Sequence, residues 1–149
     1  MTTKAIESTD LAARAARVRL AVTRTARRLR QEAGSDLGPS STSALAVIES
    51  RGPLTPSELA TIERIKRPTA TRIVARLEQE GLIDRAPDPD DGRSALLSAT
   101  ANGRELIRKL RSRKTAFLAR RMRELPDADV AALERAATVL EQMLEDKRS

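Results

Sequence analysis

The sequence predicts a mainly α-helical protein that carries one short β-hairpin. Apolar residues recur at helical spacing along most of the chain, and the one pair of strand-like segments surrounds a loop rich in Pro, Asp and Gly. A chain of 149 residues is long enough to bury one real hydrophobic core, but not two independent cores. We therefore expect a single domain over residues 1–149.

The first predicted helix covers residues 8–33 and ends at the turn-forming segment 34–39. Its stripe of apolar or small residues steps by three or four positions. These residues are Leu11, Ala15, Val18, Val22, Ala26 and Leu29. A shorter helix is expected over residues 40–49, and the Gly52-Pro53 pair stops it.

The centre of the chain combines two helices with a hairpin. Thr55-Pro56-Ser57-Glu58 is a capping box, in which the Thr hydroxyl accepts a backbone N–H and the Glu reaches back. After a tight link, a helix runs over residues 68–79, and Gly81 ends it as a left-handed cap. Strand-like segments at 82–86 and 95–97 then surround the loop 87–94, which indicates a hairpin with an extended tip.

Two helices complete the chain. Thr100 caps a long helix that reaches about residue 123, and Pro126-Asp127 opens the last one. The apolar residues of the last helix form a seven-residue repeat, which is typical of helix packing and of a dimer seam. They are Val130, Leu133, Ala137, Leu140 and Leu144.

Composition limits the chemistry. The chain has no Cys and no His, which excludes disulfides, thiol catalysis, Cys/His zinc sites and His acid–base catalysis. Phe117 is the single aromatic residue, so a base-stacking surface is not expected. The net charge of +7 favours a polyanionic partner. No segment resembles a signal peptide or a membrane span, so we expect a cytoplasmic protein without a membrane partner. We also expect no metal and no cofactor.

The order of elements predicts a winged helix-turn-helix lobe over residues 39–99. The flanking segments 8–33 and 100–147 would form a helical dimerisation part. In this fold the second helix of the helix-turn-helix lies in the DNA major groove and its N-terminal part meets the base edges. The loop 87–94 is the wing.

Helix 68–79 has the residues that such a recognition helix needs. Its core-facing residues would be Ala70, Ile73 and Leu77. Thr69, Arg72 and Arg76 would share the opposite face, where Arg reads guanine through two hydrogen bonds and Thr bonds a base or a phosphate. The alternative is an ordinary amphipathic helix whose arginines are solvated.

Other candidate contacts surround this helix. Lys66 and Arg67 precede it and suit phosphate positioning. Ser40 and Ser41 begin the helix 40–49, where hydroxyls and free N–H groups either hold a phosphate or simply cap the helix.

These segments resemble the MarR family of bacterial transcription regulators. The similarity is carried by the ordered segments 54–60, 69–78, 81–85, 88–93 and 100–104. The resemblance implies a homodimer that binds a pseudo-palindromic operator in double-stranded DNA. It also implies a repressor that a small phenolic or lipophilic effector releases from DNA. The effector would bind between the dimer helices and the DNA-binding lobe, and its pocket residues are not assigned.

The resemblance extends to the wing. It implies that Arg93 enters the minor groove and that Asp91 orients the loop or the arginine; the alternative is a plain Asp-Gly turn with an exposed Arg. Arg85 at the base of the wing would meet the DNA backbone or pair with Asp84 or Glu80. The candidate DNA-contacting residues are therefore Thr69, Arg72, Arg76, Arg93, Lys66, Arg67, Thr71, Ser40, Ser41 and Arg85.

The chain departs from the family pattern at two places. Lys66 stands where the family usually has a Ser or Asp cap, and Lys cannot accept a backbone N–H. The second helix has Ser43 and Ala44 in the region where an aromatic residue often faces the effector. The absence of Cys and His excludes the thiol-oxidation and His-rich metal branches of the family.

Three other classes compete with the regulator. An enzyme is not expected, because no nucleophile elbow, phosphate-binding glycine loop or metal-spaced acid cluster is present. The second class is a DNA-binding or chromatin-type protein that needs no effector. It would differ from the effector-released repressor only because no small molecule changes its DNA binding. The third class is a helical adaptor that binds another protein. Its affinity for DNA would be weak, independent of the DNA sequence and lost at moderate salt.

Overall fold

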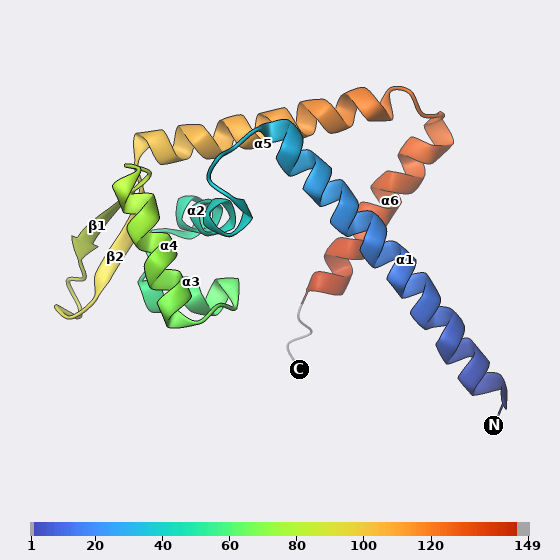
Figure 1. Cartoon of the computed structure of the whole chain (residues 1–149), viewed down its shortest axis with the longest axis horizontal. Coiled ribbons are helices and arrows are strands. Elements are labelled where there is room, and N and C mark those ends of the chain that lie inside the picture. Colours follow the sequence, from blue (N-terminus) through green and yellow to red (C-terminus); the bar gives the residue numbers. More distant parts are fainter. Residues whose placement is uncertain (1, 146–149) are drawn as a thin grey trace. The chain divides into compact units, whose positions relative to one another are not determined.

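The computed structural model describes residues 2–145. Figure 1 shows the order of the elements: α1 (Thr2–Ala33), α2 (Pro39–Arg51), α3 (Pro56–Glu63), α4 (Arg67–Gln79), β1 (Ile83–Pro87), β2 (Ala95–Ala99), α5 (Ala101–Met122) and α6 (Asp127–Leu144). The chain divides into two compact units, and the boundary lies within α5, between Lys114 and Thr115. The helical fold with one hairpin confirms the predicted fold class.

Apart from the start of α1, the observed boundaries lie within two residues of the predicted ones. The larger difference is at α1, which begins at Thr2 because nothing in the first residues breaks a helix. α2 and α4 each carry Pro at a first-turn position, where the missing N–H costs nothing.

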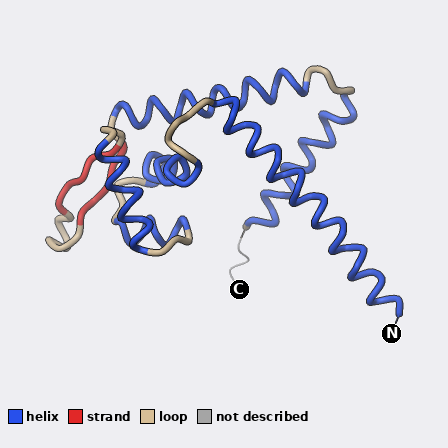
Figure 2. Tube along the Cα trace, viewed as in Figure 1, coloured by secondary structure: helices blue, strands red, loops and turns tan. Residues whose placement is uncertain are grey.

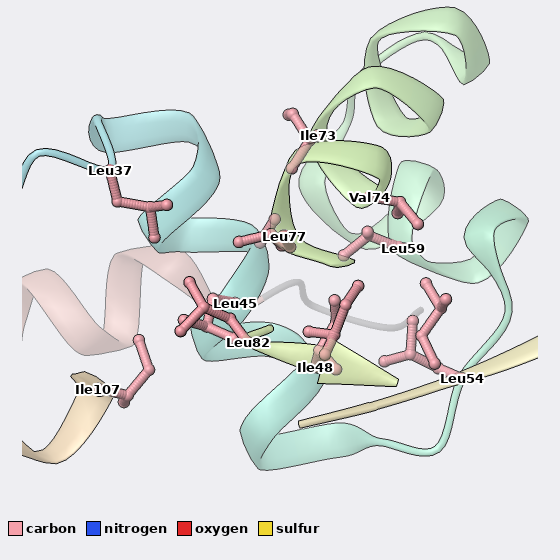
Figure 3. Packing of buried hydrophobic residues seen from close by; sticks show 13 residues of the cluster. Leu37, Leu45, Ile48, Leu54, Leu59, Ile73, Val74, Leu77, Leu82 and Ile107 are labelled. Carbon is pink, nitrogen blue, oxygen red and sulfur yellow. The ribbon is translucent and has the colours of Figure 1, made fainter. Parts of the chain in front are cut away.

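A single hydrophobic core holds α2, α3, α4 and the hairpin together (Figure 3). Leu45 and Ile48 of α2, Leu59 of α3 and Leu77 of α4 are at most 1% exposed. Leu97 of β2 closes the same core at 0% exposure. This burial is the main favourable term that fixes the position of α4.

The residues predicted to start α3 and to end α4 make hydrogen bonds to nearby residues in the chain. The Thr55 hydroxyl accepts the backbone N–H of Glu58 at 3.1 Å, as the capping box requires. The return bond from the Glu58 carboxylate is not formed within the described part of the chain. Gly81 adopts φ +70°, and the N–H of Leu82 bonds back to the Leu77 carbonyl at 2.9 Å, which ends α4.

The two strands of the hairpin are red in Figure 2. They are antiparallel, with Ile83 opposite Ala99 and Pro87 opposite Ala95. Leu54 and Leu97 exchange two backbone hydrogen bonds, of 3.1 and 2.7 Å. This bridge attaches β2 to the segment between α2 and α3, so the loop 88–94 extends from a fixed base.

α5 starts against the end of α4. The Thr100 hydroxyl donates to the Gly81 carbonyl at 2.7 Å and accepts the N–H of Gly103 at 3.1 Å. In contrast, α6 has no buried residue within the described chain. Among the helices of residues 2–145, none is both long and apolar enough to cross a membrane.

Candidate nucleic-acid interface

Helix α4 separates a core face from a polar face, as the sequence predicted. Ala70, Ile73 and Leu77 are buried, as predicted. Val74, which was not predicted to face the core, is buried with them. Arg72 is exposed on the other side. Its guanidinium makes no ion pair or hydrogen bond with any other described residue, so its donors are available to a ligand. Thr69 lies one turn earlier and is partly exposed.

The N-terminus of α4 is cationic and has no side-chain cap. Lys66 occupies the N-cap position and makes no capping hydrogen bond, as expected from its chemistry. Lys66 and Arg67 are both exposed. Unpaired N–H groups at a helix start, together with two positive charges, are suited to a phosphate.

Three hydroxyl candidates have different environments. Ser40 is exposed at the start of α2, whereas Ser41 is only 6% exposed. A direct phosphate contact from the Ser41 side chain would therefore require the chain to open there, and Ser40 is the accessible hydroxyl. Thr71 is exposed, but its hydroxyl donates to the Arg67 carbonyl at 3.0 Å.

Two candidate arginines are held by acidic residues. Arg85 Nε donates to Glu78 Oε1 at 2.9 Å, so its partner is Glu78 and neither Asp84 nor Glu80. The sequence did not indicate this pair, because Glu78 lies on α4 and Arg85 on β1. Arg76 is paired with Glu80 through Nε at 3.1 Å.

The wing loop is organised by aspartates. The Asp91 carboxylate accepts the backbone N–H of Arg93 at 3.0 Å, and its carbonyl accepts the N–H of Ser94 at 3.0 Å. Asp88 closes the base of the loop by donating its N–H to the Ser94 carbonyl at 3.2 Å. The Arg93 side chain is exposed and has no partner among the described residues. The loop thus presents a free guanidinium at its tip.

A cavity of about 210 Å³ lies between the end of α1, the start of α2 and α5. Its wall includes the apolar residues Ala33, Pro39 and Leu110 and the cations Arg30 and Lys114. None of these residues was singled out from the sequence. No sequence signal marks them, because the two cations are 84 positions apart along the chain.

Comparison with known proteins agrees with this architecture. The pattern that defines the MarR family matches residues 37–95. The chain is 36% identical over 128 residues to the HTH-type transcriptional regulator MT0903.1 of Mycobacterium tuberculosis (strain CDC 1551 / Oshkosh), covering 85% of this chain and 90% of that protein. It is 32% identical over 101 residues to the HTH-type transcriptional repressor IacR of Pseudomonas putida, covering 68% of this chain and 60% of that protein.

The fold also matches a solved structure. A crystal structure from Pseudomonas aeruginosa PA01 superposes with a TM-score of 0.82 at 33% identity, covering 93% of this chain and 98% of that one. The sequence pattern, the relative at 36% identity and the shared fold agree with one another. The chain belongs to the MarR family of transcriptional regulators.

Proposed function

We propose that this protein is a homodimeric repressor that binds a specific sequence of double-stranded DNA and is released by a small molecule. The proposal rests mainly on two arginine side chains, one on the recognition helix and one on the wing, whose guanidinium groups bind no other described residue. Among the described residues, neither Arg72 on the exposed face of α4 nor Arg93 at the tip of the wing has a side-chain partner. An arginine in each groove gives base readout in the major groove and shape readout in the minor groove.

The remaining contacts would position the lobe on DNA. Lys66, Arg67 and Ser40 are exposed around the start of the helix-turn-helix and suit phosphate oxygens. Thr69 would reach a base edge or a phosphate from the first turn of α4. The predicted helical segments 8–33 and 100–147 would then hold two such lobes in one dimer.

Exposed apolar residues support the dimer. On α1, Leu11 is 68% exposed and Val18 is 51% exposed. On α6, Leu133 is 47% exposed and Leu144 is 83% exposed. Stripes of this kind along two helices are costly in water and are covered in a partner interface. We propose that a second copy of the chain covers them, and that Leu140 lies in the seam.

The cavity between α1, α2 and α5 supports release by a small molecule. A wall that combines the apolar residues Ala33, Pro39 and Leu110 with the cations Arg30 and Lys114 fits a compact apolar body that carries an anionic or phenolic oxygen. No aromatic side chain lies in the wall, so the ligand would be held by aliphatic contact and charge and not by stacking. We infer that DNA binding represses transcription from the family and from the Pseudomonas putida relative, which is a transcriptional repressor.

Selection from random duplex DNA tests the DNA-binding part. The purified protein would be incubated with the duplex pool at about physiological ionic strength, where sequence-blind phosphate binding is reduced. We expect a pseudo-palindrome with half-sites about one helical turn apart. The matched control is Arg72→Ala, which leaves the phosphate contacts in place. If the wild-type protein enriches no motif although it is a folded dimer, the proposed function is wrong.

A constitutive DNA-binding protein is the second candidate, since none of the observations above requires a ligand response. The selected duplex separates the two candidates. A panel of small phenols and aryl carboxylic acids would be titrated into the complex, and DNA release followed by fluorescence anisotropy. Release by a panel member that also binds the free protein by calorimetry supports the sensor. Retention of the complex throughout the panel favours the constitutive protein.

A further inference from the structure

The Arg76 guanidinium joins two segments that lie far apart in the sequence. Its Nε donates at 3.1 Å to Oε1 of Glu80, the residue that caps the C-terminus of α4. Its Nη2 donates to the backbone carbonyl of Asp36 at 3.2 Å, across 40 positions of sequence. The planar fork of Arg can hold two such acceptors at once. An exposed pair with Glu80 alone would add little to stability, but the second bond attaches α4 to another part of the lobe.

The direction of the side chain sets Arg76 apart from Arg72. Because Glu80 is its partner, the Arg76 guanidinium is held beside the C-terminal end of α4. Base edges are contacted by the N-terminal part of a recognition helix. Arg72 lies one turn nearer that end and has no partner among the described residues. Arg76 therefore has the geometry of a link within the lobe, and Arg72 has that of a DNA contact.

The segment that Arg76 holds is the α1–α2 loop, residues 34–38. Its two end glycines, Gly34 and Gly38, have positive φ values of +68° and +83°, a backbone conformation that Gly adopts without steric cost. Between them Leu37 is only 3% exposed and lies with the other core side chains (Figure 3). The N–H of Leu37 also bonds to the Ser35 hydroxyl at 3.1 Å. The loop is thus a defined structure, and its displacement would also disturb the core.

The same loop forms part of the cavity wall. Ser35 and Gly38 both line the cavity, on either side of the Asp36 carbonyl that Arg76 holds. Thr42, also in the wall, donates its hydroxyl to the Gly38 carbonyl at 2.7 Å. One short loop therefore contacts the cavity at its ends and the recognition helix at its centre.

We propose that Arg76 is a positioning residue that ties α4 to the α1–α2 loop and does not contact DNA. Through this tie, the conformation of the cavity wall sets the position of the recognition helix. This assignment replaces the sequence-based expectation that Arg76 is a DNA contact. It rests on the proposed function, since it presumes that α4 binds DNA.

The first test compares Arg76→Ala and Arg76→Lys with Arg72→Ala on the duplex selected by the wild-type protein. Both Arg76 variants are expected to raise Kd roughly 2- to 30-fold, the range seen for residues that couple sites without touching a ligand. They should leave the base preference and the salt slope of binding unchanged, because no base or phosphate contact is lost. In the free protein, hydrogen exchange at residues 36–38 and in α4 should be faster than in the wild type.

Four results would overturn the assignment. A relaxed preference at one base position in Arg76→Ala would show base reading, and a salt slope reduced by about 1 would show a phosphate contact. Wild-type affinity in Arg76→Ala would show that the tie is not needed, and wild-type affinity in Arg76→Lys alone would mean that only the charge matters. Arg72→Ala, measured in parallel, should relax one base position, so the assay detects base reading where it occurs.

A double-mutant cycle tests the connection to the cavity. Thr42→Val removes the hydroxyl that holds Gly38 from the cavity side. Its effect on Kd should be at least about twofold larger in the wild-type background than in Arg76→Ala, because coupled sites are not additive. Equal effects in both backgrounds, or no effect in either, would refute the connection. If the wild-type protein selects no DNA sequence, the proposed function fails instead.

Discussion

Replacement of Gly103 by Ala is expected to destabilise the protein, although the position is helical. A Cβ built at Gly103 would collide with the backbone carbonyl oxygen of Leu82 and would come within 3.3 Å of Leu45 Cδ1. Because that oxygen belongs to the main chain, it cannot rotate away. The same oxygen also accepts the N–H of Thr100 at 3.0 Å, so any shift that relieves the collision weakens this bond.

The magnitude follows from opposing terms. Ala is favoured over Gly inside a helix by about 0.8–1.0 kcal/mol. Overpacking of a tight contact costs about 1–3 kcal/mol, and the weakened hydrogen bond costs about 0.5–1.5 kcal/mol more. The unfavourable terms are larger, so Gly103→Ala should lower the free energy of unfolding by about 0.5–4 kcal/mol. Helix propensity alone would give the opposite sign.

Urea unfolding followed by far-ultraviolet circular dichroism measures this change. All variants are compared at one protein concentration, since a dimer's stability depends on it. Gly92→Ala is the matched control, because Gly92 lies in open space and should change stability by less than about 1 kcal/mol. If Gly103→Ala is as stable as the wild type or more so, α5 does not approach Leu82 as closely as described.

Three further predictions concern function. Arg72→Ala should weaken binding to the selected duplex by about 1–3 kcal/mol and relax the preference at one base position, as measured by anisotropy and repeated selection; unchanged affinity and preference would exclude base reading. Arg93→Ala should weaken binding while the central bases of the selected motif stay the same; a changed motif would show that the wing assignment is wrong. Leu140→Asp places a charge in the proposed apolar seam and should give a monomer in sedimentation velocity; a variant that remains dimeric would move the seam elsewhere.

Features that depend on neighbouring residues can be predicted from the amino-acid sequence alone. The Thr55 cap and the Gly81 stop arise from contacts within five positions, so their residue types predict them directly. The core face of α4 follows from helical spacing, and the missing cap at Lys66 follows from the lack of an acceptor. The ordered set of these local signals was also sufficient to indicate the family.

The contacts between polar groups that lie far apart along the chain became visible only in the folded structure. Arg85 pairs with Glu78 instead of the expected acids, Arg76 reaches the loop before α2, and Ser41 is buried beside an exposed Ser40. The cavity likewise exists only where α1, α2 and α5 converge. The two kinds of feature differ in how far apart in the sequence the interacting residues lie. A helix or a turn is specified by bonds between residues a few positions apart, but a buried hydroxyl, a distant ion pair and a cavity depend on which surfaces the hydrophobic core brings together.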